Sequence, residues 1–408
     1  MENLNNNTSD GSGPTLEYLG ELVLQGFRNL KRKCESPCTL TQDATRILPP
    51  NGVNSREFLC NRLNSTLLPL LKDQLTAMLN LLGPASMKEE PKSKFRRVLE
   101  IQPELDYNIT QIHSAFLALC PESEPDSDDQ TNDQHLKHLK AYRLLEFKKK
   151  FESALQRIRN VLQTAFNYVE LWRYPGLRGE LYKDYEGQTK DVVKCIELTI
   201  QHSKRSEMDA IEDCATRAVG AIGRQLGHLI GLINPAAPRR YPFLSRPLSH
   251  QPIINLATKA TPLIKLTQLF FKKLSKHGIM NCRTLPSFTP MNSYQLERLC
   301  QSAENVSPCL EELLISLGEL DTTLEDRRLD TLLPIITKSA EDTASTLSAS
   351  LLSVVLYLIP LIDSLPEQNY YQSWFATWNT QINIAVRNVV QVARDLRDLQ
   401  YDSEDDSD

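Results

Sequence analysis

The sequence predicts an all-α fold, a bundle of long and partly proline-kinked amphipathic helices, and three observations lead to that prediction. Apolar residues recur at alternating steps of three and four along most of the chain, which is the spacing of one buried helical face. The sequence lacks the short stretches of strictly alternating apolar and polar residues that indicate half-buried strands. Glycine is scarce, at 15 of 408 residues, which disfavours a fold built on many tight β-turns.

Residues 15–120 form an N-terminal helical segment in which we expect three helices. Polar residues rich in Asn, Gly and Ser precede it, so residues 1–14 are expected to be disordered. The apolar positions of the first helix are Leu16, Leu19, Val23, Phe27 and Leu30. The second is expected to run from Ser55, as its N-cap, to Leu82, because Gly83-Pro84 ends it; the third covers about residues 94–120.

An acidic run, PESEPDSDDQTNDQ, occupies residues 121–134. Its Pro, Ser and Asp content cannot bury a core, so it is expected to be a linker. A C-terminal helical bundle over residues 135–400 should follow, and the acidic tail 401–408 should be disordered.

The bundle is expected to begin with a long helix near Asp133 that ends at Tyr174-Pro175-Gly176. One or two helices should lie between Gln188 and Ile233, before a proline-rich basic connection. Each of the next two stripes covers about four heptads, which predicts helices packed along their whole length. These stripes are Leu296, Leu299, Ala303, Val306, Leu310, Leu313, Leu317, Leu320 and Leu324, and then Tyr371, Phe375, Trp378, Ile382, Ala385, Val389, Val392, Leu396 and Leu399.

Prolines interrupt several of these periodic segments, at positions 69, 262, 308, 334 and 360. An interior proline costs about 3 kcal/mol and kinks a helix. The stripe stays in phase across Pro308, which favours one kinked, continuous helix there. The alternative is a new helix with Ser307 as its N-cap and Pro308 at the first helical position.

Two patterns, one apolar and one made of glycines, each have a structural and a functional interpretation. Thr343 to Ile362 is 20 residues without a charge, enough to span a bilayer, but six of them are Ser or Thr. We therefore expect a central helix buried on all sides rather than a membrane span. Gly220, Gly223, Gly227 and Gly231 share one helical face, which predicts close helix packing, with a groove for a partner helix as the alternative.

Residues of the kinds that bind metals occur in two places, and neither predicts a site. His135 and His138 have ligand-like spacing near Asp133, but no further His or Cys lies at a fitting distance in the sequence. Asp128, Asp129 and Asp133 resemble the magnesium-binding carboxylates of all-helical prenyl-diphosphate enzymes, yet they lie in the linker with no second acidic motif. The sequence also has no familiar hydrolase, phosphate-binding or dinucleotide-binding motif. We accordingly expect no catalytic residue, no metal and no cofactor.

The net charge of −5 hides an uneven distribution. Removing the eleven acids of the linker and the tail leaves +6 for the rest of the chain. Residues 135–173 carry a net +6 and residues 304–330 a net −6, which intramolecular pairing or solvation explains more simply than phosphate binding. Nucleic acid is therefore not an expected partner. Ser403 precedes acids, as in sites of acid-directed serine kinases, although a solubilising tail is the simpler interpretation.

Nine cysteines are scattered without a CxxC pair, and the N-terminus has neither the basic nor the apolar region of a secretory signal. Reduced thiols in the cytoplasm or the nucleus are the consistent expectation.

The segment LIKLTQLFFKKLSK, followed by a short proline-containing loop and a long amphipathic helix, resembles an uncharacterised all-helical family expanded in rust fungi. The resemblance covers about residues 144–399 and implies a helical fold and an intracellular setting, with no known activity. A fainter architectural likeness is to vinculin-like and cyclin-D-binding-protein-like helical bundles, which implies an adaptor role by analogy only.

The function expected by elimination is a non-enzymatic protein-interaction or scaffold module with protein partners of unspecified identity. An enzyme with a non-standard site inside the bundle is the first alternative, and a membrane-associated helical protein is the second. A deep cavity with convergent carboxylates would favour the enzyme, and an exposed apolar groove would favour the scaffold.

Overall fold

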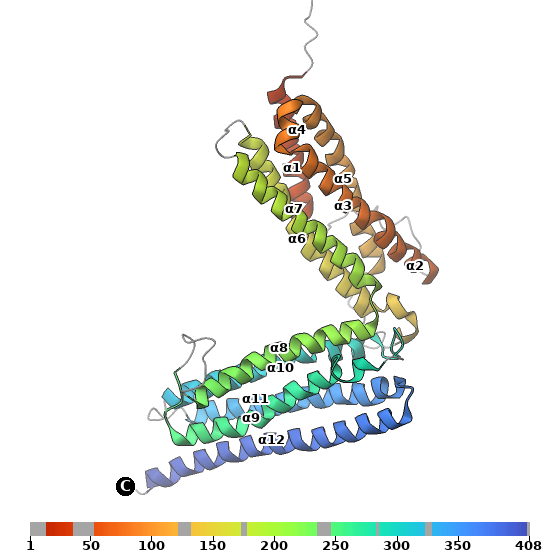
Figure 1. Cartoon of the computed structure of the whole chain (residues 1–408). Coiled ribbons are helices and arrows are strands. Elements are labelled where there is room, and N and C mark those ends of the chain that lie inside the picture. The colour runs from red at the N-terminus through yellow and green to blue at the C-terminus, as the bar shows by residue number, and fades with distance from the viewer. Residues whose placement is uncertain are drawn as a thin grey trace, which may run out of the picture. The chain divides into compact units, whose positions relative to one another are not determined.

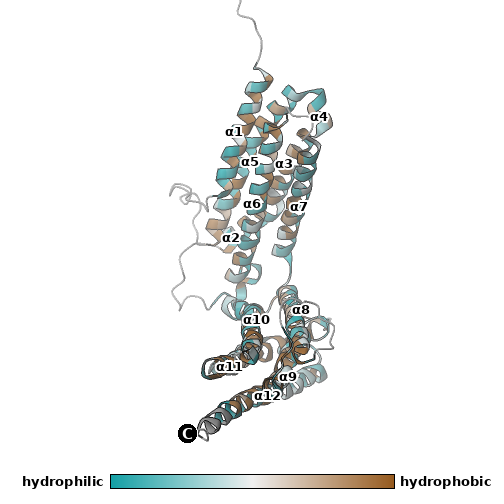
Figure 2. Cartoon of the chain, turned by 90° about the vertical axis from the view of Figure 1, so that its left-hand side faces the viewer, coloured by the Kyte–Doolittle hydropathy of each residue, from teal (hydrophilic) through white to brown (hydrophobic). Residues whose placement is uncertain are grey.

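The computed structural model describes residues 14–35, 53–120, 132–172, 178–234, 246–282, 285–322 and 329–405. Every regular element in these ranges is a helix, which confirms the predicted all-α fold (Figure 1). Apolar and polar residues alternate around the same helices, as amphipathic packing requires (Figure 2).

The chain divides into two compact units, which we call unit 1 (residues 1–126 and 138–204) and unit 2 (residues 127–137 and 205–408). The main division therefore falls after Lys204, whereas the sequence placed it in the acidic segment 121–134. The physical reason is that the two long helices after this segment, Ala141–Glu170 and Arg178–Lys204, pack against helices that precede it. Residues 121–131 lie outside the described ranges, and the expected linker is not tested there.

Unit 1 closes its long helices into a ring. Neighbours around the ring are α1, α6, α7, α3 and α5, with α5 packing against α1 again. The bounds are α1 Leu16–Glu35, α2 Val53–Arg62, α3 Leu68–Leu81, α4 Pro84–Glu89, α5 Pro91–Leu119, α6 Ala141–Glu170 and α7 Arg178–Lys204.

Most helices of unit 1 match their predicted positions, but α4 and the start of α7 at Arg178 were not predicted. Further differences concern two prolines and the start of α6. A π-helical turn, Leu63–Leu67, joins α2 to α3 directly before Pro69. Since a proline ring collides with the carbonyl four residues earlier, the wider turn gives it room. α5 also contains an interior proline, Pro103, that the sequence analysis did not single out. The helix predicted from Asp133 begins at Ala141, because a 3₁₀ segment with Lys137 at φ 51° precedes it.

The core of unit 1 combines aromatic rings with buried amides. The ring of Phe116 lies 5.0 Å from that of Phe147 and stacks on that of Phe151 at 5.2 Å. Gln102, on α5, is 4% exposed and donates a hydrogen bond to the Val23 carbonyl of α1 at 2.9 Å. Asn108 likewise donates to the Leu67 carbonyl (3.1 Å) at the end of the π turn. These amides join helices while satisfying polar groups that water cannot reach.

Unit 2 is a second ring, in the order α8, α9, α12, α11, α10 and back to α8. Its bounds are α8 Glu207–Ile233, α9 Gln251–Leu274, α10 Ser293–Thr322, α11 Leu329–Ser353 and α12 Leu365–Asp405. The region predicted as one or two helices between Gln188 and Ile233 thus contains the end of α7 and all of α8. α12 continues to Asp405, into the segment expected to be disordered, and residues 406–408 lie outside the described ranges.

Helix α10 is continuous across Pro308, as the favoured interpretation of its apolar stripe predicted. α11 continues into a π turn, Val354–Leu358, and a 3₁₀ turn that contains Pro360. Both units therefore place a π turn just before a proline.

Carboxylates distant in sequence hold the starts of two helices in unit 2. Asp321, at the end of α10, accepts hydrogen bonds from the backbone N–H and side chain of Ser249 and of His250, at the start of α9. Asp133 accepts from the backbone N–H of Ser293 at 2.8 Å and from its hydroxyl, at the start of α10. The positive end of the helix dipole favours an acid at each of these positions.

The far end of α9 is tied to α12 by a cation held among aromatic rings. The Lys273 ammonium lies 4.6 to 5.1 Å from the ring centroids of Tyr370, Tyr371 and Trp374 and donates to the Tyr370 hydroxyl at 2.9 Å. Such cation–π contacts add to the apolar packing of the same helices.

Candidate functional site

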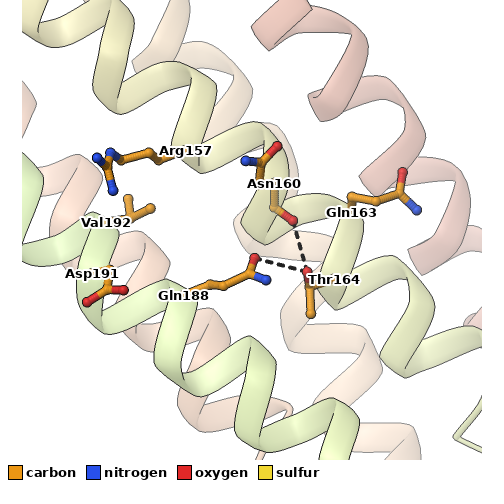
Figure 3. A pocket seen from close by; sticks show the side chains of 7 residues that line it. All are labelled: Arg157, Asn160, Gln163, Thr164, Gln188, Asp191 and Val192. Atoms are coloured by element: carbon orange, nitrogen blue, oxygen red, sulfur yellow. Dashed lines mark hydrogen bonds between the residues drawn. The ribbon is translucent and has the colours of Figure 1, made fainter. Parts of the chain in front are cut away.

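A polar groove with a volume of about 490 Å³ lies between α6 and α7 of unit 1 (Figure 3). Seven residues line it: Arg157, Asn160, Gln163, Thr164, Gln188, Asp191 and Val192. The helical repeat explains the set, since residues 157, 160 and 164 of α6 and residues 188, 191 and 192 of α7 lie on the facing sides of two adjacent helices.

Hydrogen bonds fix several of the side chains that line this groove. The Thr164 hydroxyl donates to the Gln188 side-chain oxygen at 3.0 Å, and it also lies 3.1 Å from the Asn160 carbonyl (Figure 3). The Gln188 amide in turn donates to both carboxylate oxygens of Asp184, at 3.0 and 3.1 Å. Beside them, the Gln163 oxygen accepts a hydrogen bond from Lys31 of α1 at 2.7 Å.

The groove offers amides, one hydroxyl and exposed charges of both signs, from Arg157 and Asp191. Such groups can form hydrogen bonds to a polar surface or a peptide backbone. They include no serine, cysteine or histidine that could act as a nucleophile or base within the lining. This groove could not be predicted from the sequence, because its residues form no motif and meet only through the packing of α6 on α7.

A second candidate surface lies on α11 of unit 2, where the prediction of a helix buried on all sides is wrong. α11 packs against α10 on one flank and α12 on the other, and the remaining flank is open. Leu352 is 59% exposed and Leu356 is 53% exposed. Glu341 and Asp342 give the first half of the same flank an ordinary charged surface, whereas from Thr343 to Ile362 it has no charge.

Two hydrogen bonds fix α11 on α10 and so hold this apolar flank in place. The Ser339 hydroxyl donates to Glu312 at 2.9 Å, and the Gln295 amide of α10 donates to the Tyr357 hydroxyl at 2.7 Å. Their positions show that the two helices run antiparallel.

By length and composition, the helical run Leu329–Leu361 is also the one described helix that could cross a membrane. Only 33% of its most apolar window is buried. The core helix of a soluble protein can have the same composition, so this feature alone does not distinguish the two.

The glycine stripe of α8 does not mediate the close packing that was predicted for it. A side chain added at Gly227 or Gly231 would meet no atom within 4 Å, and at Gly220 only the end of Arg224 at 3.9 Å. Gly223 is the exception, with the Gln268 amide of α9 at 2.8 Å from such a Cβ. The stripe therefore faces mostly away from its described neighbours. The close approach instead occurs at Gly26 of unit 1, where the Gln102 oxygen lies 1.9 Å from the position a Cβ would take.

The described residues considered for metal binding lie in and beside one short segment. Asp133 caps α10, while His135 and His138 lie in the 3₁₀ segment Gln134–Leu139. Asp128 and Asp129 lie outside the described ranges. Within those ranges no group of three or more His, Cys, Asp or Glu side chains could hold a metal ion.

The basic residues of 135–173 have several partners within unit 1. Arg159 pairs with Glu35 at 2.9 Å, Lys149 with Glu146 at 3.0 Å, and Lys140 is fully buried. Arg143 donates to the Ser203 carbonyl of α7 at 3.4 Å. Arg159 and Arg143 thus join α6 to α1 and to α7, whereas pairing of the basic segment with the acidic residues 304–330 stays a prediction. The side chains of the tail, including Ser403, are not described.

Comparison with known families covers both units. Residues 206–391 match the family model described as Domain of unknown function (DUF8721), and residues 56–210 match the one described as Domain of unknown function (DUF8723). The two matches meet close to the division of the chain after Lys204. No curated protein and no solved structure matches the chain. The chain is therefore similar to domains of uncharacterised families over residues 56–391.

Proposed function

We propose that the protein is a non-enzymatic interaction module, a helical scaffold that binds a protein partner through the open flank of α11. The exposure of Leu352 and Leu356 on an uncharged part of that flank is the observation that carries the proposal. Apolar side chains gathered on a surface favour contact with another apolar surface over contact with water.

The chemistry of the flank indicates the kind of partner. Burying a leucine side chain contributes about 1.5–3 kcal/mol, so the two leucines together can anchor an interface. Exposed serines, Ser348 and Ser345, lie one and two turns before Leu352 and can form hydrogen bonds beside it. An amphipathic helix with a leucine-sized apolar stripe would fit this combination.

The test is affinity purification with mass spectrometry on the full chain and on the double variant Leu352→Gln/Leu356→Gln. The matched control is Ser345→Gln/Ser348→Gln, which adds side chains of the same kind to the same flank. We expect the wild type and the control to recover a common partner that the leucine variant loses. Equal recovery by all three proteins would overturn the assignment of the flank, and recovery of no partner by the wild type would overturn the interaction module itself.

A membrane-associated protein is the second candidate, and the composition of Leu329–Leu361 is the observation that favours it. In that case the open flank would face lipid and not a protein. Expression followed by fractionation separates the two: recovery in the supernatant without detergent supports the interaction module, and recovery only with detergent supports the membrane protein.

The proposal has two further parts that rest on the sequence. The protein is located in the cytoplasm or the nucleus, and it belongs to the helical family expanded in rust fungi. The resemblance that suggests them covers about residues 144–399, and the segments quoted for it lie in α9, the following loop and α10.

A further inference from the structure

One long stretch of unit 2 has no acidic residue. Residues 214–296 contain eleven Lys and Arg and no Asp or Glu, although the whole chain has 51 acids against 46 of these bases. The stretch includes most of α8 and all of α9, which pack side by side (Figure 1). α12, the other neighbour of α9, has no acid from Gln368 to Arg394. Three adjoining helices of the ring are therefore basic over most of their length.

The cations of these helices are exposed. Five of them form what we call the basic face: Arg224 of α8, Lys259, Lys265 and Lys272 of α9, and Arg387 of α12. Among the described residues, none of the five has an ion pair. By comparison, Lys276, just after α9, pairs with Glu212 at 3.2 Å. The charge of the basic face is thus left for a partner from outside the unit.

The other two helices of the ring have the opposite charge. α10 and α11 together carry nine Asp and Glu, against Arg298 and Lys338. Glu304, Glu311 and Glu341 are among the exposed acids. Unit 2 therefore has a basic side and an acidic side, and a negatively charged surface attracts the first while it repels the second. Such a surface would bind the unit in one orientation.

Apolar side chains lie among the cations of the basic face. Leu269 is 44% exposed on α9, four residues after Lys265 and three before Lys272, so the three are neighbours on the helix surface. On α12, Ile384 is 41% exposed and precedes Arg387 by three residues. A helix face that combines lysine or arginine with large apolar residues is typical of binding at a membrane surface, where both kinds of side chain find a partner.

We propose that the basic face binds the surface of a membrane that contains anionic lipids. The lysines and arginines pair with the negative groups of the lipids, and Leu269 and Ile384 enter the boundary between head groups and acyl chains. This is peripheral binding by the folded unit, through helices other than the possible span Leu329–Leu361. It uses neither Leu352 nor Leu356 and does not depend on the proposed function.

Two other anionic partners account for less of what the basic face presents. A nucleic acid would pair with the cations, but its phosphates offer nothing to Leu269 and Ile384. The acidic side of a second copy of this chain would also match the charges. Contact between two different faces of identical copies is head to tail, however, and extends into an open chain unless the rotation between copies closes it.

The first experiment is flotation of the full chain with vesicles of phosphatidylcholine alone and of an equimolar mixture with phosphatidylserine. We expect binding to the anionic vesicles in about 0.1 M salt and release in about 1 M salt, since the Debye length falls from about 10 Å to about 3 Å. Lys265→Gln/Lys272→Gln should weaken this binding about 30-fold, because each lysine near the surface contributes roughly a fivefold factor.

The matched control is Arg298→Gln/Lys338→Gln, which removes the same number of charges from α10 and α11 and should bind as the wild type does. A third variant, Leu269→Gln, should weaken binding about fivefold, because part of the leucine side chain loses its burial in the bilayer. That loss distinguishes a membrane from a partner that meets the charges alone.

Four results would overturn the proposal. The first is no binding to the anionic vesicles, or equal binding to vesicles of phosphatidylcholine alone. The second is equal weakening by the two double variants, which would make net charge the cause. The third is tighter binding to a duplex oligonucleotide than to the vesicles, with no effect of Leu269→Gln. The last is salt-sensitive assembly of the chain without vesicles that both double variants abolish, which would indicate a second copy as the partner.

Discussion

Unit 1 and unit 2 both close their long helices into a ring, but they satisfy their inner polar groups with different chemistry. Unit 1 joins helices through buried neutral amides, such as Gln102 on the Val23 carbonyl, and places a histidine, His113, against its aromatic core. Unit 2 also joins helices through an amide, that of Gln268 on the Val219 carbonyl. In addition, it anchors two helix starts with carboxylates, Asp321 at α9 and Asp133 at α10. Because imidazoles and carboxylates titrate in different ranges, the two units should respond differently to acid and to substitution.

The largest expected effect is the loss of stability when a buried aromatic ring is removed from the core of either unit. Phe151→Ala in unit 1 and Phe270→Ala in unit 2 each remove a ring that is at most 1% exposed and packed on other aromatics. Each should cost about 3–5 kcal/mol of stability. Hydrogen exchange followed by mass spectrometry should show lost protection confined to the unit that carries the change. Equal loss in both units would mean that they unfold as one.

Acid should weaken unit 1 first, through His113. Burial, and then the charges of Lys33 and Lys148, lower the pKa of His113 from 6.5 to about 4. A base with a lowered pKa contributes stability above its unfolded pKa, and this is lost as pH falls from about 6.5 to 4. The loss amounts to roughly 2–3 kcal/mol. Denaturant unfolding of the wild type and of His113→Leu across this range checks it, and an unchanged pH profile in the variant would exclude His113 as the cause.

A substitution at Gly26 should lower the stability of unit 1, because this glycine packs against the side chain of Gln102. Ala at this position would place its Cβ 1.9 Å from the buried Gln102 oxygen, so Gln102 must move and give up its bond to Val23. We expect Gly26→Ala to cost about 1–3 kcal/mol, measured by denaturant unfolding. Gly20→Ala, on the same helix with its nearest atom at 3.6 Å, is the control. A Gly26→Ala variant as stable as that control would contradict the packing described for Gln102.

As the pH falls, unit 2 should lose the Asp321 cap of α9 at a lower pH than the one at which His113 weakens unit 1. Burial raises the pKa of the Asp321 carboxyl, but its hydrogen bonds from Ser249 and His250 outweigh this and hold the pKa below its usual 3.8. This contribution is present above about 3.8 and is lost as pH falls through the lower folded value. Asp321→Ala should cost about 1–2 kcal/mol at pH 7. Hydrogen exchange at the start of α9 reports it, and normal protection there in the variant would argue against the cap.

The smallest expected effect is a gain. Gly227 on α8 faces open space, so Gly227→Ala should raise the stability of unit 2 by about 0.5–1 kcal/mol, since alanine loses less backbone entropy in a helix. Gly223→Ala should give no such gain, because its Cβ would displace the Gln268 amide from the Val219 carbonyl. Thermal unfolding compares the two, and a loss of stability at Gly227 would show that the stripe packs closely after all.

Local sequence patterns predicted where the helices lie and which of their faces are buried. The stripes of α1, α10 and α12 have buried residues at most of their predicted positions, for example Phe27, Leu310 and Phe375. This works because a period of 3.6 residues is a property of one helix, and a side chain on its apolar face will be buried whatever covers it. The same patterns gave a wrong prediction of burial for the open flank of α11, because an uncharged run has the same sequence pattern whether its outer face is covered or exposed.

The amino-acid sequence by itself determined the all-α class, the apolar stripes and the continuity of α10 through Pro308. Only the tertiary structure decided that the chain divides after Lys204 and that α6 and α7 form the polar groove. It also decided that Gly26, and not the glycines at 227 and 231, is closely packed. The physical reason is that a helix specifies its own faces, whereas the identity of each facing neighbour depends on which arrangement of all the helices buries the most apolar surface together.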